Sequence, residues 1–198
     1  MVTAAFEELP FALTWVSEER LPRTSHALAD GGRVWLVDPV DAAGAVARAQ
    51  ALGEPAAVIQ LLERHNRDCA AIAARLGIPH LYVPDAVPDG PFDVIDVVSW
   101  PAWHERALWW PRHRTLVVAE AVGTSEAFTA GLGPVGVHAF LRPLPPRTLR
   151  DIAPEHLLVG HGPSVHGDAA RSGLDQALRR ARRDLPRFAA RLPALLRG

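Results

Sequence analysis

The sequence contains no lysine, a single cysteine and no long apolar run. All 21 basic residues among its 198 are arginines, and this arginine-, alanine- and proline-rich usage is typical of a GC-rich bacterial genome. Individual arginines therefore carry little functional weight by default. The lone cysteine, Cys69, excludes an intrachain disulfide and favours a reducing compartment, so we predict a cytoplasmic protein.

The lack of long apolar stretches also bears on the partners of the chain. No run approaches the ~20 apolar residues that a membrane-spanning helix needs. The first ten residues carry Glu7 and Glu8 and lack a basic segment before an apolar core, so we expect neither a signal peptide nor a membrane partner. A net charge of -1 gives no general attraction to nucleic acid.

The composition that remains is that of a globular protein. Hydrophobic residues make up 48% of the chain and charged residues 22%, which is enough apolar material to bury a core without disulfides. We expect one domain over residues 1–198, in which residues 168–198 form a C-terminal helical segment.

Turn signals divide the chain into short strands and helices. Asp30-Gly31-Gly32 predicts a hairpin between strands at 25–29 and 33–37, and a second hairpin is expected between 107–110 and 115–119. Helices are expected at 42–52, 68–76, 148–152 and 168–196, the last with a break before Pro186. Hairpins in both halves with helices between them predict an α/β fold, a four-layer αββα sandwich of two mixed sheets.

Five segments within residues 34–162 resemble, in order, the motifs of the metallo-β-lactamase fold. They are the strand Val34–Val37 ending in Asp38, the strand and loop Val58–Cys69, the turn Pro101–His104, the strand Leu116–Ala121, and the strand and turn Pro154–Gly162. Each lies at a strand end, where the metal ligands of that family converge. The resemblance implies the sandwich fold and a metal-dependent hydrolase acting on a thioester, lactone, lactam, phosphodiester or similar bond.

The loop at residues 64–69 matches the His-x-His-x-Asp-His motif of the family only in part. Arg64 and Asn66 stand in place of its first two histidines, Asp68 is retained, and Cys69 replaces its third histidine. A full binuclear site is therefore broken. Here His65 is expected to face solvent and to lie outside the ligand set.

The later motifs supply the remaining candidates. Glu120 stands where the family has a metal-bridging aspartate, His161 lies in a Gly-His-Gly turn, and His104 matches its motif with one residue inserted. The resemblance then implies one bound metal ion, zinc or alternatively iron or manganese, held by sulfur, nitrogen and oxygen donors. The implied ligands are Asp68, Cys69, Glu120 and His161. Asp68 or His104 would move a proton during hydrolysis.

Two other interpretations remain open. A protein of the same fold that binds no metal would act as a binding or scaffold protein, with Arg64 paired to Glu120 or Asp68. A nucleic-acid-processing protein is the third, because residues 169–198 carry eight arginines against two aspartates. We prefer a solvated arginine face to a nucleic-acid partner, since the chain as a whole is not basic.

Four tryptophans, Trp100, Trp103, Trp109 and Trp110, fall within eleven residues around the His104 turn. Trp109 and Trp110 are neighbours on one expected strand, so they face opposite sides, one toward the core and the other toward a rim. The cluster indicates a pocket for a small apolar or planar substrate, ordinary core packing, or a contact in a homo-oligomer.

Overall fold

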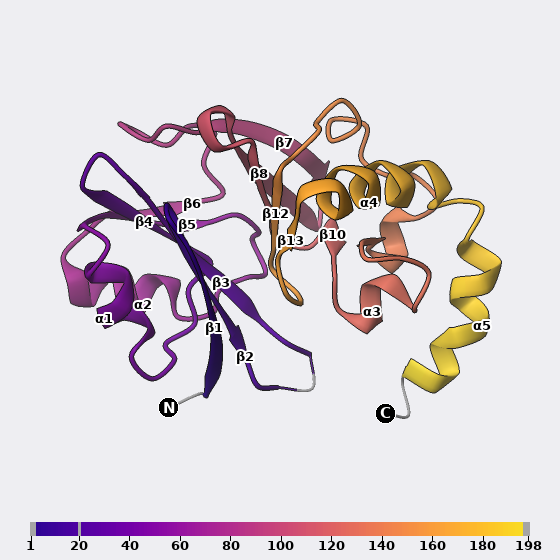
Figure 1. Ribbon diagram of the computed structural model, residues 1–198, viewed down its shortest axis with the longest axis horizontal. Coiled ribbons are helices and arrows are strands. Elements are labelled where there is room, and N and C mark those ends of the chain that lie inside the picture. Colours follow the sequence, from indigo (N-terminus) through magenta and orange to yellow (C-terminus); the bar gives the residue numbers. More distant parts are fainter. Residues whose placement is uncertain (1–2, 20, 196–198) are drawn as a thin grey trace.

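The computed structural model describes residues 3–19 and 21–195. Two mixed β-sheets face each other (Figure 1). The strands of the first sheet are, in spatial order, β1 (Ala4–Leu9), β2 (Ala12–Ser17), β3 (Thr24–Asp30), β4 (Arg33–Val37), β5 (Glu54–Gln60) and β6 (His80–Tyr82). Strands β1 to β4 are antiparallel neighbours, whereas β4, β5 and β6 are parallel and are joined by α1 (Ala45–Gln50) and α2 (Cys69–Leu76).

The second sheet has the order β13, β12, β9, β8, β7. These strands are β7 (Asp93–Trp100), β8 (Trp103–Trp110), β9 (Thr115–Val118), β12 (His156–Val159) and β13 (Val165–His166). Strands β9 and β12 are parallel, and the other pairs are antiparallel. The rest of this half comprises η1 (Pro111–His113), β10 (Val122–Gly123), α3 (Glu126–Thr129), β11 (Gly136–Val137), η2 (Ala139–Leu141), α4 (Gly167–Arg180) and α5 (Leu185–Leu195).

The main core lies between the two sheets and contains aromatic side chains from both. Trp35 on β4 meets Phe92 edge to face at 5.3 Å between ring centroids, and Phe92 meets Trp110 on β8 in the same way at 5.2 Å. Such edge-to-face pairs add to the free energy gained from burial itself. A separate apolar cluster, with Leu36 and Ile72 among its members, joins α1 and α2 to the outer side of the first sheet.

Helix α4 packs against β12 and β13 on the other side of the molecule (Figure 1). Helices therefore cover the two outer faces, and the predicted class of two mixed sheets between helices is confirmed. Both expected hairpins are present as β3–β4 and β8–β9. No helix among the described residues is long and apolar enough to cross a membrane.

Two local predictions need correction, and one strand was not predicted. Helix α1 begins at Ala45 because Gly44, with a left-handed φ of 75°, turns the chain just before it. Residues 148–151 form turns where a helix was expected. Strand β1 was not anticipated.

In the C-terminal segment, turns at residues 181–184 separate α4 from α5. The expected helix end at Leu196 and the last arginine, Arg197, lie outside the described residues. Arg171, Arg179 and Arg187 each form an ion pair with a nearby acidic side chain.

The tryptophans divide between the core and the surface. Trp110 is fully buried and Trp109 is half-buried, as expected from their alternation on β8. Trp103 is buried at the start of β8, and Trp100 at the end of β7 keeps 38% of its surface exposed.

Candidate metal centre

The parallel pairing of β9 with β12 brings Glu120 and His161 together. Val118 pairs with Val159 at the carboxyl ends of these strands. Glu120 and His161 each lie two residues beyond that pair, so both side chains lie at the same edge of the second sheet. Glycine is needed between them, since a Cβ at Gly160 would lie 2.2 Å from the carbonyl oxygen of Ala119.

His65 reaches the same place from the loop that follows β5. Its side chain is buried, with 7% of its surface exposed. A potential ligand atom of His65 lies within 4.8 Å of one from Glu120 and one from His161. Among the described residues, this is the one such group of three that could hold a metal ion. The three side chains are called the His65 group below.

A carboxylate fixes the ring of His65. Its Nδ1 lies 3.0 Å from Oδ2 of Asp38, the residue that follows β4. An ionised carboxylate can only accept, so we assign the proton to Nδ1, which leaves the lone pair on Nε2. That Nε2 atom is buried and has no hydrogen-bond partner among the described residues.

Asp38 is itself held in place. Its Oδ1 accepts a hydrogen bond from the backbone N–H of Leu61 at 3.0 Å. Burial alone would raise the pKa of Asp38, but His65, Arg67 and the Leu61 N–H outweigh it and hold that pKa below its usual value. The carboxylate is thus ionised at neutral pH and remains an acceptor for His65.

His161 has the same tautomer for the same reason. Its Nδ1 lies 3.0 Å from the carbonyl oxygen of Pro22, which can only accept, so Nε2 again carries the lone pair. Burial, together with the neighbouring His65 and Arg67, lowers the pKa of His161 to about 4. The imidazole is therefore neutral at pH 7, which is the form that binds metal ions. Its ring stacks on Phe128 with an interplanar angle of 20°.

Glu120 is the anionic member of the group. Arg64 donates a hydrogen bond from Nη2 to its Oε2 at 2.6 Å, and Nε2 of His138 lies 3.8 Å from its Oε1. Burial would raise the pKa of Glu120, but the hydrogen bond from Arg64 and the nearby His65, His138 and Arg64 side chains hold it below its usual value. Arg64 thus engages one oxygen, and Oε1 accepts no hydrogen bond within the described part of the chain.

Half-buried Arg67 and fully buried Glu105 support the backbone around the group. The guanidinium of Arg67 donates to the carbonyl oxygens of Thr24, Asp38 and Gly160, which joins the ends of three strands. The carboxylate of Glu105 accepts the N–H of Glu120 at 2.8 Å.

Glu105 also fixes its surroundings in two further ways. Its carboxylate accepts the N–H of Ala121 at 2.8 Å and the indole N–H of Trp103 at 2.9 Å. Burial raises the pKa of Glu105 to about 7, although these hydrogen bonds act in the opposite direction. The backbone that carries Glu120 and the ring of Trp103 are therefore held by one side chain.

Of the four ligands implied by the sequence motifs, the structure brings together only Glu120 and His161. Asp68 lies just before α2, where its Oδ2 accepts the backbone N–H of Asp41 at 2.8 Å. Cys69 is fully buried in the cluster beneath α2, and burial raises the pKa of its thiol far above the usual value. Neither belongs to the His65 group.

Two histidines need separate comment. His104 lies outside the His65 group, with its Nδ1 2.9 Å from Oε2 of Glu63 and 45% of its side chain exposed. The expectation that His65 faces solvent is wrong. The motif alignment misses His65 by one position, because Asn66 aligns with the second histidine of the motif. A histidine in a loop that follows a buried strand is the only sequence signal for it.

Comparisons with known proteins agree on the fold. The chain is 13% identical to the metallo-β-lactamase DIM-1 over 91% of this chain and 99% of that one, with a TM-score of 0.61. TMB-1 is 14% identical, with 91% and 99% covered and a TM-score of 0.63. A metallo-β-lactamase from Pontibacter korlensis is 10% identical, with 89% and 99% covered and a TM-score of 0.63. No protein-family model and no curated protein matches the sequence.

Proposed function

We propose that this chain, which has the metallo-β-lactamase fold, is a hydrolase that uses one metal ion bound by His65, Glu120 and His161. The observation that carries the proposal is the buried Nε2 atom of His65, which has no hydrogen-bond partner among the described residues and lies beside a second histidine and a carboxylate. A buried polar atom without a hydrogen bond costs about 1–3 kcal/mol. A bound cation would remove that cost.

The donor set fits a catalytic metal ion. Two imidazole nitrogens and one carboxylate oxygen suit Zn²⁺ in hydrolases and Fe²⁺ in other enzymes. Three protein ligands leave at least one coordination position free for water or substrate, whereas structural zinc sites are closed by four. The carboxylate of Asp38 behind His65 is the outer partner that metal-binding histidines ordinarily have. When bound, a divalent ion supplies Lewis-acid activation of water and of the scissile carbonyl or phosphoryl group.

Two side chains next to Glu120 would act on the substrate. Nδ1 of His138 accepts the backbone N–H of Phe140 at 3.3 Å, so its Nε2 carries the proton and faces Glu120. The guanidinium of Arg64 is fixed by the carbonyl oxygen of Ala102 at 3.1 Å and by the ring of Trp103. Both present N–H donors at the rim of the group, where they would stabilise negative charge that develops on a substrate oxygen.

The substrate class follows from the fold neighbours and from these donors. DIM-1 and the Pontibacter protein are metallo-β-lactamases by name. We propose that this chain hydrolyses an ester, thioester or cyclic amide of a small molecule. The competing interpretation, a protein of the same fold without metal or catalysis, makes opposite predictions in the experiment below.

The test is the metal content of the protein purified without a chelating tag. We expect about one zinc or iron per chain by elemental mass spectrometry, and nearly none in His65→Ala, because two remaining ligands bind metal weakly. His80→Ala is the matched control, since His80 pairs with Gln60 and lies outside the group. It should keep its metal.

Activity is then measured on a panel of thioesters, lactones and β-lactams. The metal-loaded wild type and His80→Ala should hydrolyse the same substrate, and His65→Ala should not. If the wild type binds no metal even with excess Zn²⁺ or Fe²⁺, the hydrolase proposal fails and the protein without metal becomes the better account.

A further inference from the structure

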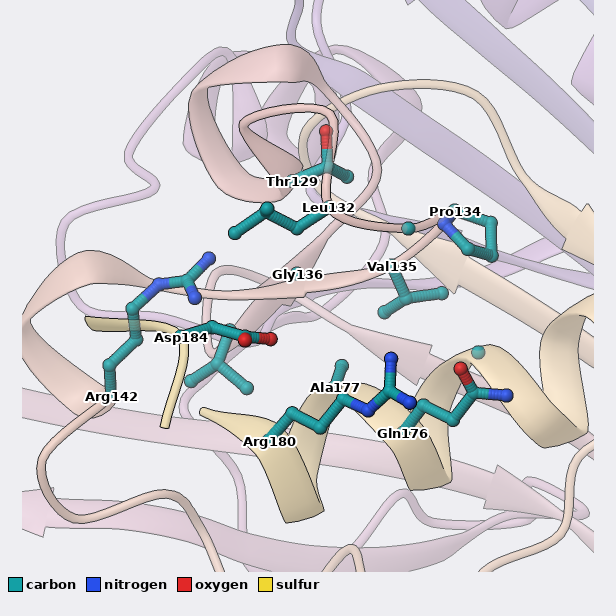
Figure 2. Close-up of a pocket in the computed structure, with 13 residues that line it drawn as sticks. Thr129, Leu132, Pro134, Val135, Gly136, Arg142, Gln176, Ala177, Arg180 and Asp184 are labelled. Atoms are coloured by element: carbon teal, nitrogen blue, oxygen red, sulfur yellow. The ribbon is translucent and has the colours of Figure 1, made fainter. Parts of the chain in front are cut away.

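In the described part of the chain, two hollows of very different volume lie beside the second sheet. The smaller has a volume of about 20 Å³ between α4 and residues 129–137, and Figure 2 shows Arg142 and Asp184 at one end of it and Gln176 and Ala177 on its α4 side. A space of that size holds a water molecule and no larger ligand. The larger hollow has a volume of about 480 Å³, which lies in the range of small-molecule sites.

Most of the residues that line the larger hollow are apolar, and Ser99 and Arg147 are the polar ones. One wall is the end of β7 and includes Trp100, and the other is formed by η2 and the loop after it, including Leu141, Leu144 and two prolines. Arg147 completes the lining. The residues named here are called the Trp100 hollow below.

Aromatic rings connect the Trp100 hollow to the His65 group. The ring of Trp100 lies 6.3 Å from that of Trp103, measured between centroids. The ring of Trp103 in turn lies 4.7 Å from that of His138 and 4.2 Å from the guanidinium carbon of Arg64. Since His138 and Arg64 both flank Glu120, the ring of Trp103 and these two side chains lie between the hollow and the candidate metal centre. The hollow is therefore a neighbour of that centre.

The apolar surface at this place is exposed to water. Trp100 and Leu144 keep 38% and 52% of their surface exposed, and Phe140 on η2, next to Leu141 of the hollow, keeps 76%. Exposed large apolar side chains gathered at a concave surface are typical of ligand-binding sites. An apolar group bound there would remove surface from water on both partners.

The charge at the hollow indicates which polar group the ligand carries. Arg147 is exposed, and its side chain forms neither an ion pair nor a hydrogen bond with any described residue. A guanidinium at an apolar site favours a carboxylate or phosphate joined to an apolar group. Neutral apolar compounds would gain nothing from it.

From its place beside the candidate metal centre, its volume and its charge we infer that the Trp100 hollow binds the alkyl or aryl group of an anionic substrate, whose negative group pairs with Arg147. The inference rests on the proposed function for the reaction itself. Binding, however, is measured on metal-free protein, so the two proposals fail separately.

The probes are hexanoate, octanoate and decanoate, titrated calorimetrically into the metal-free full chain. We expect the affinity to rise roughly threefold to fourfold for each added methylene group. Octanamide, which is neutral and of the same shape, should bind roughly two- to fivefold more weakly than octanoate, as expected for an exposed ion pair.

Variants with matched controls locate the binding. Leu144→Glu should abolish the dependence on chain length, whereas Leu52→Glu, at an exposed leucine outside the hollow, should not. Arg147→Gln should make octanoate and octanamide bind equally, and Arg150→Gln should preserve the difference. All four positions are exposed, so the variants are expected to fold.

The inference is overturned if wild-type affinity does not depend on chain length, or if Leu144→Glu and Leu52→Glu behave alike. Concentration-dependent dimers that disappear in Leu144→Glu, without octanoate binding to the wild type, would assign the apolar surface to a second copy of the chain. If octanoate binds as expected but the wild-type protein takes up no metal, this inference stands and the hydrolase proposal fails.

Discussion

His26 and His65 are both buried histidines of the first half of the chain, yet their rings are engaged differently. In His26, on β3, Nδ1 lies 2.8 Å from the hydroxyl of Thr14 and Nε2 lies 3.1 Å from the carbonyl oxygen of Val159. Both ring nitrogens therefore have partners. In His65 only Nδ1 has one, the carboxylate of Asp38, and Nε2 is buried without a partner among the described residues.

Exposure does not distinguish the two residues, since 1% of His26 and 7% of His65 is accessible. What distinguishes them is the number of ring nitrogens that have a hydrogen-bond partner. A fully bonded ring serves packing, because a ligand would have to displace an existing hydrogen bond. A ring nitrogen whose lone pair is buried without a partner carries a free-energy cost, which a bound metal ion can remove. The predictions below test that difference.

The largest expected effect concerns His26 and pH. Burial lowers its pKa to about 4 from its usual value of 6.5. A group with a depressed pKa in the folded state contributes stability that is present above pH 6.5 and is lost as the pH falls through about 4. Between pH 7.5 and 4.5 the unfolding free energy should fall by about 2–3 kcal/mol on account of His26.

The measurement is urea unfolding at those two pH values for wild type and His26→Gln. Glutamine can hydrogen-bond to Thr14 and to the Val159 carbonyl without titrating. On acidification, the His26→Gln variant should therefore lose about 2–3 kcal/mol less unfolding free energy than the wild type. His80→Gln controls for removal of a histidine elsewhere. Equal losses in wild type and His26→Gln would show that His26 is protonated at little cost, and the contrast between the two histidines would weaken.

The second effect concerns the carboxylate behind His65. In Asp38→Asn the amide nitrogen can face Nδ1 of His65, which moves the imidazole proton to Nε2 and blocks the ligand atom. We expect metal affinity to fall roughly 10- to 100-fold, the usual effect of losing such a partner. Asp41→Asn is the matched control, because Asp41 is exposed and pairs with Arg75. Competition with a chelator of known affinity measures the change, and equal affinities in the two variants would contradict the role given to Asp38.

Much of the fold could be predicted from local patterns. Asp30-Gly31-Gly32 marks a hairpin because glycine accepts a left-handed backbone, and both glycines have positive φ values, 55° and 79°. Strand β1 escaped prediction because it carries Glu7 and Glu8 and has no buried side chain, so it lacks the apolar pattern of an inner strand. Its place at the edge of the sheet depends on pairing with β2.

The candidate site was predictable only where strands determine it. Glu120 and His161 follow directly from β9 and β12, and parallel strands end at one edge of a sheet. His65 lies in a loop whose path depends on distant contacts, above all the carboxylate of Asp38 and the three carbonyl oxygens that bind Arg67. The spacing of residues along the loop does not depend on these contacts. A motif alignment therefore selects the neighbours of His65 and not His65 itself.

The smallest expected effects belong to those neighbours. Cys69→Ala should leave metal content unchanged and cost about 1 kcal/mol of unfolding free energy, because it removes one buried sulfur from a packed cluster. Asp68→Asn should also keep its metal and change stability by about 0.5 kcal/mol or less, since an amide oxygen can still accept the N–H of Asp41. Elemental analysis of both variants beside His65→Ala decides between the ligand sets. Loss of metal in Asp68→Asn or Cys69→Ala, with retention in His65→Ala, would restore the ligands implied by the motif and would mean that the loop rearranges around the ion.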